Sequence, residues 1–328
     1  MKQRKLGALG PAVGEIGLGC MGMTGRYGPA DEVESIATLH RAIDLGVTLL
    51  DTAQVYGPLT NEELVGRAIR GRRDSVVIAT KFGYQIRDGQ VGSPNSHPDL
   101  IRESVDGSLR RLGIDTIDLL YQHRVDPRTP IEDVAGAVGQ LVAAGKVRSF
   151  GLSEASPRTV RRAHATHPVS ALQTEYSLWE RFVEKEILYT CAELGITFVA
   201  YSPLGRGFLT GRNKPAADYG EDDARHFDPR MQVETYERNL VLLGHVQRIA
   251  TDKSVAPGQV ALAWLLHRGD NIIPIPGTKR VKYLEENAGA ADVTLDASDM
   301  AALDDAMPPG VTAGPRYIPK SLANIDRS

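Results

Sequence analysis

Short apolar runs alternate with longer amphipathic runs along almost the whole chain. The short runs are rich in aliphatic and β-branched residues and have the length of buried strands, while each following segment has features of a helix. Repeated strand–helix units predict parallel strands, because the helix returns the chain to the starting edge of the sheet. Eight such runs occur, at residues 15–21, 47–52, 75–81, 116–123, 147–153, 170–176, 196–202 and 271–276.

Eight units in succession predict a closed (β/α)8 barrel, an α/β fold of the TIM-barrel type. No G-x-G-x-x-G sequence opens a helix after the first strand, which argues against a doubly wound dinucleotide-binding sheet. The length of 328 residues suits one barrel with insertions, so we expect a single domain over residues 1–328.

Capping residues mark several of the helices between the strands. Pro130 is expected in the first turn of a helix over residues 130–144. Ser156 and Pro157 are typical of the N-cap and first residue of a helix over residues 156–166. Glycine follows the segments at residues 31–45, 97–112 and 130–144, as expected for helix ends.

Four segments fall outside the eightfold pattern. Residues 1–14 hold a hairpin signal, and we expect this hairpin to cover the barrel floor. Residues 205–230 are rich in Gly, Pro and charge, which predicts a long loop on the C-terminal face, placed to act as a lid. Residues 232–253 predict an extra helix before the one that begins near Pro257, and residues 311–328 show no clear element.

Composition and charge exclude several classes of protein. The formal net charge of −3 gives no basis for binding nucleic acid or an anionic membrane. No run approaches the roughly 20 apolar residues of a membrane span, and the first residues lack the apolar core of a secretion signal. The two cysteines, Cys20 and Cys191, are expected to be reduced and buried, consistent with a cytoplasmic protein. We expect no metal site, and both a monomer and a small homo-oligomer remain open.

Four polar residues stand at or just after the ends of three successive predicted strands. Asp51 lies at the end of the second strand and Tyr56 in the short loop after it, while Lys81 ends the third strand and His123 ends the fourth. The C-terminal ends of parallel barrel strands meet at one rim, where barrel enzymes place their active sites, so these side chains should converge. Each residue alone has an ordinary structural interpretation, such as a turn or rim packing, but the four together favour proton transfer coupled to another reaction.

Tyr56 is the candidate general acid. A free tyrosine has a pKa of about 10, and the ammonium of Lys81 is expected to lower it. A buried lysine needs a counter-charge, which Asp51 can supply. His123 would hydrogen-bond and orient a substrate carbonyl oxygen. The set suits a reaction in which an oxygen gains a proton while its carbon gains a hydride.

The segments DTAQVYG, IATKFG and DLLYQHRVD resemble the catalytic segments of the aldo-keto reductase superfamily, in particular its bacterial and plant-type members, and the resemblance extends from IGLGCMGM to LEENAGA. The family's Asp, Tyr, Lys and His tetrad maps onto Asp51, Tyr56, Lys81 and His123. This resemblance implies a (β/α)8 barrel, NADPH as cofactor, and reversible reduction of aldehydes or ketones to alcohols. Relatives with glutamate in place of the histidine reduce steroid double bonds, so His123 favours carbonyl reduction.

The resemblance also implies a site for the nicotinamide. GLSEASP and ALQTEYS match the segments that hold the carboxamide through Ser153 and Gln173, and Tyr201 matches the aromatic residue that stacks under the ring. Glu154 stands where many members have Asn, which leaves the role of that position open. The resemblance assigns further cofactor contacts to other residues. Gly22 and Met23 would lie beside the nicotinamide ribose, and Asp51 would also contact the cofactor. The segment around the pyrophosphate would contribute Ser202, Leu204 and Arg206.

The segment IPIPGTKRVKYLEENAGA predicts a strand that leads into a helix whose first turn offers free backbone N–H groups to an anion. Its positive charge would suit the extra phosphate on the adenosine ribose, so we expect NADPH rather than NADH. The residues expected on that turn are Gly277, Thr278, Lys279 and Arg280. Glu286 and Asn287 match the family pair that contacts the adenine, whereas Tyr283 replaces the Arg or Gln that the family often has.

Several rim residues are candidates to line the substrate pocket, although ordinary packing explains each of them equally well. Arg124 directly follows His123 and would meet a polar or anionic substrate. The candidates are Met21, Tyr27, Tyr84, Arg124 and Trp179.

Two alternatives to a carbonyl reductase remain. The resemblance also reaches the β subunits of voltage-gated potassium channels, so a non-catalytic NADPH-sensing subunit is one alternative. The short stretch before the first predicted strand favours the enzyme, because it holds no long channel-blocking peptide. The second is an alcohol or sugar dehydrogenase that runs in the oxidative direction. The sequence leaves the physiological substrate open, because fold alone does not determine function.

Overall fold

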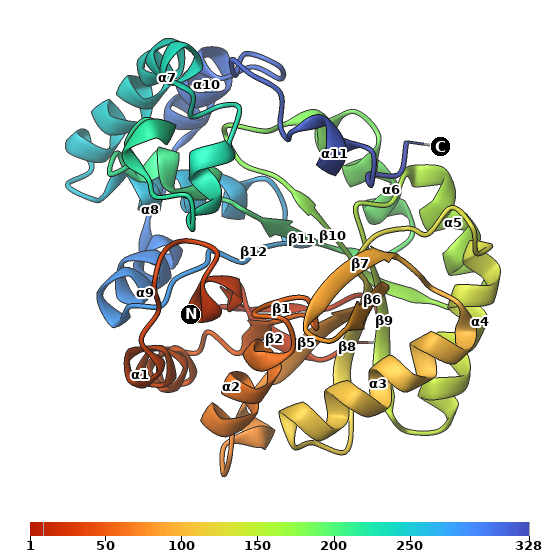
Figure 1. Ribbon diagram of the computed structural model, residues 1–328. Coiled ribbons are helices and arrows are strands. Elements are labelled where there is room, and N and C mark those ends of the chain that lie inside the picture. Colours follow the sequence, from red (N-terminus) through yellow and green to blue (C-terminus); the bar gives the residue numbers. More distant parts are fainter. Residues whose placement is uncertain (9, 328) are drawn as a thin grey trace.

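Eight parallel strands form one sheet that curls into a barrel with helices on its outside (Figure 1). The computed structural model describes residues 1–8 and 10–327. The strands follow the order β12-β11-β10-β9-β8-β5-β4-β3. All eight lie within one residue of the predicted runs: β3 (Leu18–Gly19), β4 (Leu49–Asp51), β5 (Val77–Phe82), β8 (Ile117–Gln122), β9 (Val147–Ser153), β10 (Val169–Glu175), β11 (Thr197–Tyr201) and β12 (Ile272–Pro274).

Backbone hydrogen bonds close the barrel between β3 and the segment that follows β12. The N–H of Gly17 donates to the carbonyl of Pro274 at 3.0 Å, and the N–H of Gly19 donates to that of Pro276 at 3.2 Å. Gly19 and Gly277 also form a parallel bridge. The predicted (β/α)8 barrel is therefore confirmed, and its closure brings the first-strand loop beside the segment that leads into α9 (Val281–Ala288).

The N-terminal hairpin of β1 (Gln3–Lys5) and β2 (Ala12–Gly14) covers the barrel floor, as predicted. Leu6 and Val13 are fully buried and pack with the inward-facing strand residues that fill the barrel. The N–H of Gly7 donates at 2.7 Å to the hydroxyl of Thr197, at the start of β11. The hairpin thus seals the end of the barrel opposite the candidate site.

Helices surround the barrel, and side chains cap some of them at the N-terminus. The Asp31 side chain accepts from the N–H of Glu34 at 2.8 Å before α1, and the Ser156 hydroxyl accepts from the N–H of Thr159 at 3.2 Å at the start of α5. The helices are α1 (Glu32–Asp44), α2 (Thr60–Ala68), α3 (Pro98–Leu112), α4 (Ile131–Ala143), α5 (Pro157–Thr166), α6 (Ile187–Glu193), α7 (Val233–Asp252), α8 (Pro257–His267), α9, α10 (Ala297–Ala306) and α11 (Pro319–Leu322).

The structure differs from the predicted elements in three places. Pro130 precedes α4 and stands at its N-cap, outside the first turn. A hairpin of β6 (Tyr84–Arg87) and β7 (Gln90–Pro94), which the strand–helix pattern did not reveal, follows β5. The short helix α11 lies in the tail, where no element was expected. The predicted extra helix over residues 232–253 corresponds to α7.

The long loop, residues 205–230, contains three short 3-10 helices, Gly205–Thr210, Ala216–Asp218 and Ala224–Phe227. It crosses to the first-strand loop, where the N–H of Ala224 donates to the carbonyl of Arg26 at 2.9 Å and Tyr27 pairs with Asp223 in an antiparallel bridge. These contacts join the loops that follow β11 and β3, the two strands that flank β12 in the closed barrel. A lid role for the long loop stays a prediction. Within residues 1–8 and 10–327, none of the helices combines the length and apolar character that a bilayer crossing requires.

Candidate active site

Three of the four predicted catalytic residues meet at one buried ammonium. Lys81, 1% exposed, and Asp51, 2% exposed, lie on the neighbouring strands β5 and β4. The Lys81 Nζ donates to Asp51 Oδ1, to the carbonyl of Thr52 at 2.9 Å and to the Tyr56 hydroxyl at 3.3 Å. The ammonium also lies 5.0 Å from the centroid of the Tyr56 ring. The charge of Lys81 is therefore compensated by Asp51 and directed at the Tyr56 oxygen.

The electrostatics of Tyr56 correct the expectation from the sequence. Burial raises the pKa of Tyr56, and the Lys81 ammonium opposes this rise without cancelling it. Burial lowers the pKa of Lys81, but the Asp51 carboxylate beside it brings that pKa above its ordinary value. At neutral pH Tyr56 is thus a neutral phenol beside a permanent cation, which suits a proton donor.

His123 stands between two tyrosine rings at the end of β8. Its ring centroid lies 5.9 Å from that of Tyr56 and 5.5 Å from that of Tyr84, in both cases edge to face. Burial holds the pKa of His123 well below its ordinary value, and the charges of Arg124 and Lys81 lower it further. The imidazole is therefore neutral at physiological pH. Its buried Nδ1 has no hydrogen-bond partner among the described residues.

Gln173 connects the predicted nicotinamide segment to the catalytic carboxylate. It lies on β10, is 3% exposed, and its Nε2 donates to Asp51 Oδ2 at 2.7 Å. Ser153 ends β9, and its hydroxyl accepts from Arg124 at 3.3 Å. Both predicted carboxamide residues thus lie on the same rim as the catalytic residues and are already hydrogen-bonded.

Glu154, whose role the sequence left open, is a buried anchor for the C-terminal tail. It is 2% exposed and forms an ion pair with Arg316, 162 residues further along the chain. Its Oε1 also accepts from the hydroxyl of Tyr201 at 2.8 Å. The Arg316 guanidinium keeps the pKa of Glu154 below its usual range despite burial.

The strand ends that carry the predicted cofactor residues hold strained backbone. The backbone φ angles of Glu154, Ser202 and Arg206 are 55°, 48° and 57°, values that residues other than glycine rarely adopt. Strained residues of this kind cost about 1–3 kcal/mol each and gather at functional sites. Three of the seven described non-glycine residues with positive φ thus follow the ends of β9 and β11, and two of them, Ser202 and Arg206, are predicted cofactor residues.

Arg206 belongs to a dense ion network at the start of the long loop. Its guanidinium donates to Asp228, to Glu175 at 3.2 Å and to the carbonyl of Arg316 at 3.1 Å. It also lies 4.6 Å from the ring centroid of Tyr317. The predicted pyrophosphate residue is thus held between the long loop and the tail.

The predicted phosphate-binding residues lie just before α9 and not within its first turn. The helix begins at Val281, with Arg280 as its N-cap. The ammonium of Lys279 donates to the carbonyls of Tyr27 and Gly28, at 3.0 and 3.1 Å, and so ties this segment to the first-strand loop. Arg280 is exposed, and its guanidinium remains the more available cation for a phosphate.

Arg212, which sequence reasoning missed, lies at the same end of the site. It forms two hydrogen bonds with Glu286, at 2.9 and 2.7 Å, and lies 5.2 Å from the ring centroid of Tyr283. The long loop thereby provides a guanidinium where the family often has an Arg at the position of Tyr283. Asn287 is buried in α9 beside this pair.

The candidate pocket residues take different places. Tyr84 borders His123, while the ring centroid of Tyr27 lies 5.3 Å from the Arg225 guanidinium of the long loop. Arg124 donates to the carbonyl of His123 at 2.7 Å. Met21 lies in a 3-10 helix after β3, together with the predicted cofactor residues Gly22 and Met23, and the buried Trp179 packs against Phe208.

Sequence reasoning missed three further residues of the site. Glu175 ends β10 inside the quoted ALQTEYS segment, two residues after Gln173, but was given no role. Arg316 and Tyr317 come from the tail, which offered no local signal of its position. The sequence analysis singled out Glu154 as a departure from the family but left its role open, so its pairing with Arg316 was not predicted. Among the described residues, no group of three or more His, Cys, Asp and Glu side chains is arranged to hold a metal ion.

Comparison with known proteins identifies the family. The profile of the Aldo/keto reductase family matches residues 15–307. The chain is 47% identical to the NADP(+) aldo-keto reductase yakc of Schizosaccharomyces pombe, covering 98% of this chain and 96% of that protein. Its structure is similar to a glycerol dehydrogenase of Gluconobacter oxydans, with a TM-score of 0.86, 28% identity and coverage of 97% and 98% of the two chains.

A second solved structure with this fold is the Klebsiella pneumoniae aldo/keto reductase in complex with NADP and acetate. It has a TM-score of 0.77 and 27% identity, and the similarity covers 97% of this chain and 99% of that one. Since the family profile spans most of the sequence and the relatives match along nearly their full length, this chain belongs to the aldo/keto reductase family.

Proposed function

We propose that this protein reduces aldehydes or ketones to alcohols with NADPH as the hydride donor, and that Tyr56 is the general acid. The observation that carries the proposal is the buried Lys81 ammonium, which contacts both the Asp51 carboxylate and the Tyr56 hydroxyl. This arrangement couples a neutral proton donor to a fixed cation, and His123 lies beside it.

The donor set fits the proposed cofactor. Gln173 and Ser153 offer amide and hydroxyl groups for a carboxamide, and Tyr201 offers an aromatic ring. Arg206 provides a cation for the pyrophosphate. Lys279, Arg280 and Arg212 supply positive charge for a ribose phosphate near Glu286 and Asn287. The S. pombe relative is named for NADP(+), and the K. pneumoniae structure contains NADP.

The residues of the chain divide the chemistry between them. Bound NADPH would supply a hydride to the carbonyl carbon of the substrate. Tyr56 donates its proton to the carbonyl oxygen, and the Lys81 ammonium stabilises the phenolate that remains. Asp51 keeps Lys81 charged and in place. His123, which is neutral, hydrogen-bonds the same oxygen and orients it.

Substitution of Tyr56 by Phe tests this assignment directly. The variant lacks only the hydroxyl, so we expect turnover of aldehydes to fall by at least about 10²–10⁴-fold, the usual contribution of a general acid. NADPH affinity, measured by fluorescence titration, should stay near the wild-type value. Turnover within a few-fold of wild type would remove Tyr56 from the proposed role.

Oxidation of alcohols is a second candidate function, because one of the structural relatives is a glycerol dehydrogenase. The same residues serve the reverse reaction, with the Tyr56 phenolate as the base. Initial rates with NADPH and aldehydes, compared with those for NADP(+) and the matching alcohols, distinguish the preferred direction. A single domain, a cytoplasmic location and the absence of nucleic-acid partners remain predictions.

A further inference from the structure

We propose that Arg316 and Tyr317 form a clamp with Glu154 and Glu175 that fixes the ring of Tyr201 and so positions the nicotinamide half of the cofactor. This inference rests on the proposed function and assigns to the C-terminal tail a part of cofactor binding that no motif indicated. These four residues are called the C-terminal clamp below.

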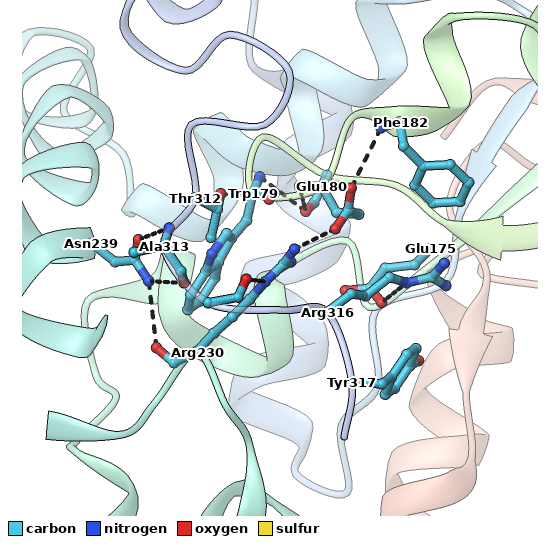
Figure 2. A network of polar contacts seen from close by, with 12 residues as sticks. Glu175, Trp179, Glu180, Phe182, Arg230, Asn239, Thr312, Ala313, Arg316 and Tyr317 are labelled. Atoms are coloured by element: carbon cyan, nitrogen blue, oxygen red, sulfur yellow. Dashed lines mark hydrogen bonds and ion pairs between the residues drawn. The ribbon is translucent and has the colours of Figure 1, made fainter. Parts of the chain in front are cut away.

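The tail that carries the clamp is anchored at defined points just before Arg316. The hydroxyl of Thr312 donates to the carbonyl of Trp179 at 2.7 Å. The backbone of Ala313 forms two hydrogen bonds with the Asn239 side chain, at 2.8 and 3.1 Å. Figure 2 shows this anchor, together with the ion pair of Arg230 and Glu180 that lies beside it.

Arg316 is the centre of the clamp. Its guanidinium, 9% exposed as a side chain, donates from Nε to Glu175 at 2.7 Å and from Nη1 to Glu154 at 3.0 Å. Both carboxylates are 2% exposed, and the arginines around them keep the pKa of each below its usual range. Buried ion pairs bring little net stability, because desolvation offsets their attraction. A role in fixing geometry therefore explains this network better than a role in stability alone.

The clamp converges on the hydroxyl of Tyr201. That oxygen contacts Glu154 Oε1 at 2.8 Å, the Tyr317 hydroxyl at 2.7 Å and Arg316 Nη2 at 2.6 Å. Three partners leave the aromatic ring little freedom to rotate or withdraw. Because a ring that is held in its bound orientation loses less conformational entropy on binding, these contacts would prepare Tyr201 for the nicotinamide before the cofactor arrives.

The same residues hold Arg206. Glu175 Oε2 accepts from both Arg316 and Arg206, at 2.7 and 3.2 Å, and the Arg206 guanidinium lies against the Tyr317 ring. The clamp therefore links the residue assigned to the nicotinamide with the one assigned to the pyrophosphate. Arg212 and Glu286, which are assigned to the adenosine end, instead form two hydrogen bonds with each other.

Two ligands, NADPH and 2′,5′-ADP, distinguish a role of the C-terminal clamp in nicotinamide binding from a general role in protein stability. NADPH spans the whole proposed site, whereas 2′,5′-ADP contains only the adenosine end with its extra phosphate. We expect three variants, Tyr317→Phe, Glu154→Gln and Arg316→Gln, to weaken NADPH binding by about tenfold or more. Each variant removes a hydrogen bond from the C-terminal clamp, and Glu154→Gln and Arg316→Gln also remove a charge from it. The affinity for 2′,5′-ADP should change by less than about twofold.

Matched controls and a double variant complete the test. Tyr189→Phe and Arg161→Gln change exposed residues away from the site and should leave both affinities unchanged. Tyr201→Phe keeps the ring but removes the clamped hydroxyl, so Tyr317→Phe should add little to it. If Arg316→Gln fails to fold, the isosteric Tyr317→Phe still gives the answer.

The outcomes distinguish the clamp from the proposed function. NADPH affinity of Tyr317→Phe and Glu154→Gln within about twofold of wild type would overturn the clamp. Equal losses for NADPH and 2′,5′-ADP would also overturn it, because they would indicate a general structural effect. If the wild-type protein bound neither probe, the proposed function itself would be contradicted, and the clamp with it.

Discussion

At the scale of single residues, the hydrogen bonds of the Lys81 ammonium hold the proposed catalytic residues in place. The ammonium is almost completely buried and is satisfied by a carboxylate, a backbone carbonyl and a phenol. Asp51 in turn accepts from Gln173 on its second oxygen. A buried charge of this kind is tolerable only when its partner is present, because an unpaired ion in the interior costs several kcal/mol.

Removal of the charge from Lys81 alone should therefore lower the free energy of unfolding more than removal of the charges from both Lys81 and Asp51. We expect Lys81→Met to lower the free energy of unfolding by about 3–5 kcal/mol, because it leaves the Asp51 carboxylate buried without its cation. The double variant Lys81→Met/Asp51→Asn should recover part of that loss. Urea denaturation of the two single variants and the double variant measures this coupling, and strictly additive losses would contradict it.

The neutral state of His123 predicts a specific dependence of stability on pH. Its pKa is lowered in the folded protein, so the unfolded chain takes up the proton more readily and stability falls as pH drops below about 6.5. The loss amounts to about 1.4 kcal/mol for each unit of lowering, until the folded pKa is reached. Unfolding curves at a series of pH values should show a smaller decline for His123→Gln than for wild type. Parallel declines would show that His123 titrates normally.

Sequence reasoning placed the four proposed catalytic residues on one rim because each lies at a strand end or in the loop that follows it, where topology alone brings them together. Their catalytic roles stay predictions. It did not predict the direction of the Tyr56 pKa shift. That direction depends on how far burial outweighs the nearby Lys81 charge, and burial is a property of the packed rim and not of local sequence.

At the scale of elements, the strands and most helices follow from apolar periodicity and capping residues. The hairpin of β6 and β7 did carry a signal, since Asp88-Gly89 is a typical two-residue hairpin turn and both residues have positive φ. The neighbouring strands Tyr84–Arg87 and Gln90–Pro94 are half-buried or exposed, however, and lack the apolar alternation used to recognise strands.

The long loop brings Arg212 to α9, and this contact predicts cofactor preference. Arg212→Ala removes a guanidinium from the proposed ribose-phosphate end, so we expect the KM for NADPH to rise by about tenfold while the KM for NADH changes little. Steady-state kinetics with both cofactors measure this. Arg238→Ala, at an exposed position on α7, is the matched control. An equal rise for NADPH and NADH would contradict a phosphate contact.

At the scale of the whole molecule, the barrel was predictable because eight strand–helix units admit few other arrangements. The return of the tail to the rim was not predictable, because the ion pair of Arg316 with Glu154 joins residues 162 positions apart. Local patterns carry no information about such a contact. The unusual acidic residue at position 154 was the one trace that the sequence offered.

The central claim concerns the whole molecule, and the most direct measurement is the oxidation of NADPH by the wild-type protein with a panel of aldehydes and ketones, alongside NADH. The account predicts turnover of one or more carbonyl compounds with NADPH and much slower turnover with NADH. Tight NADPH binding without turnover of any of these compounds, or of the matching alcohols with NADP(+), would contradict catalysis and favour the cofactor-sensing alternative.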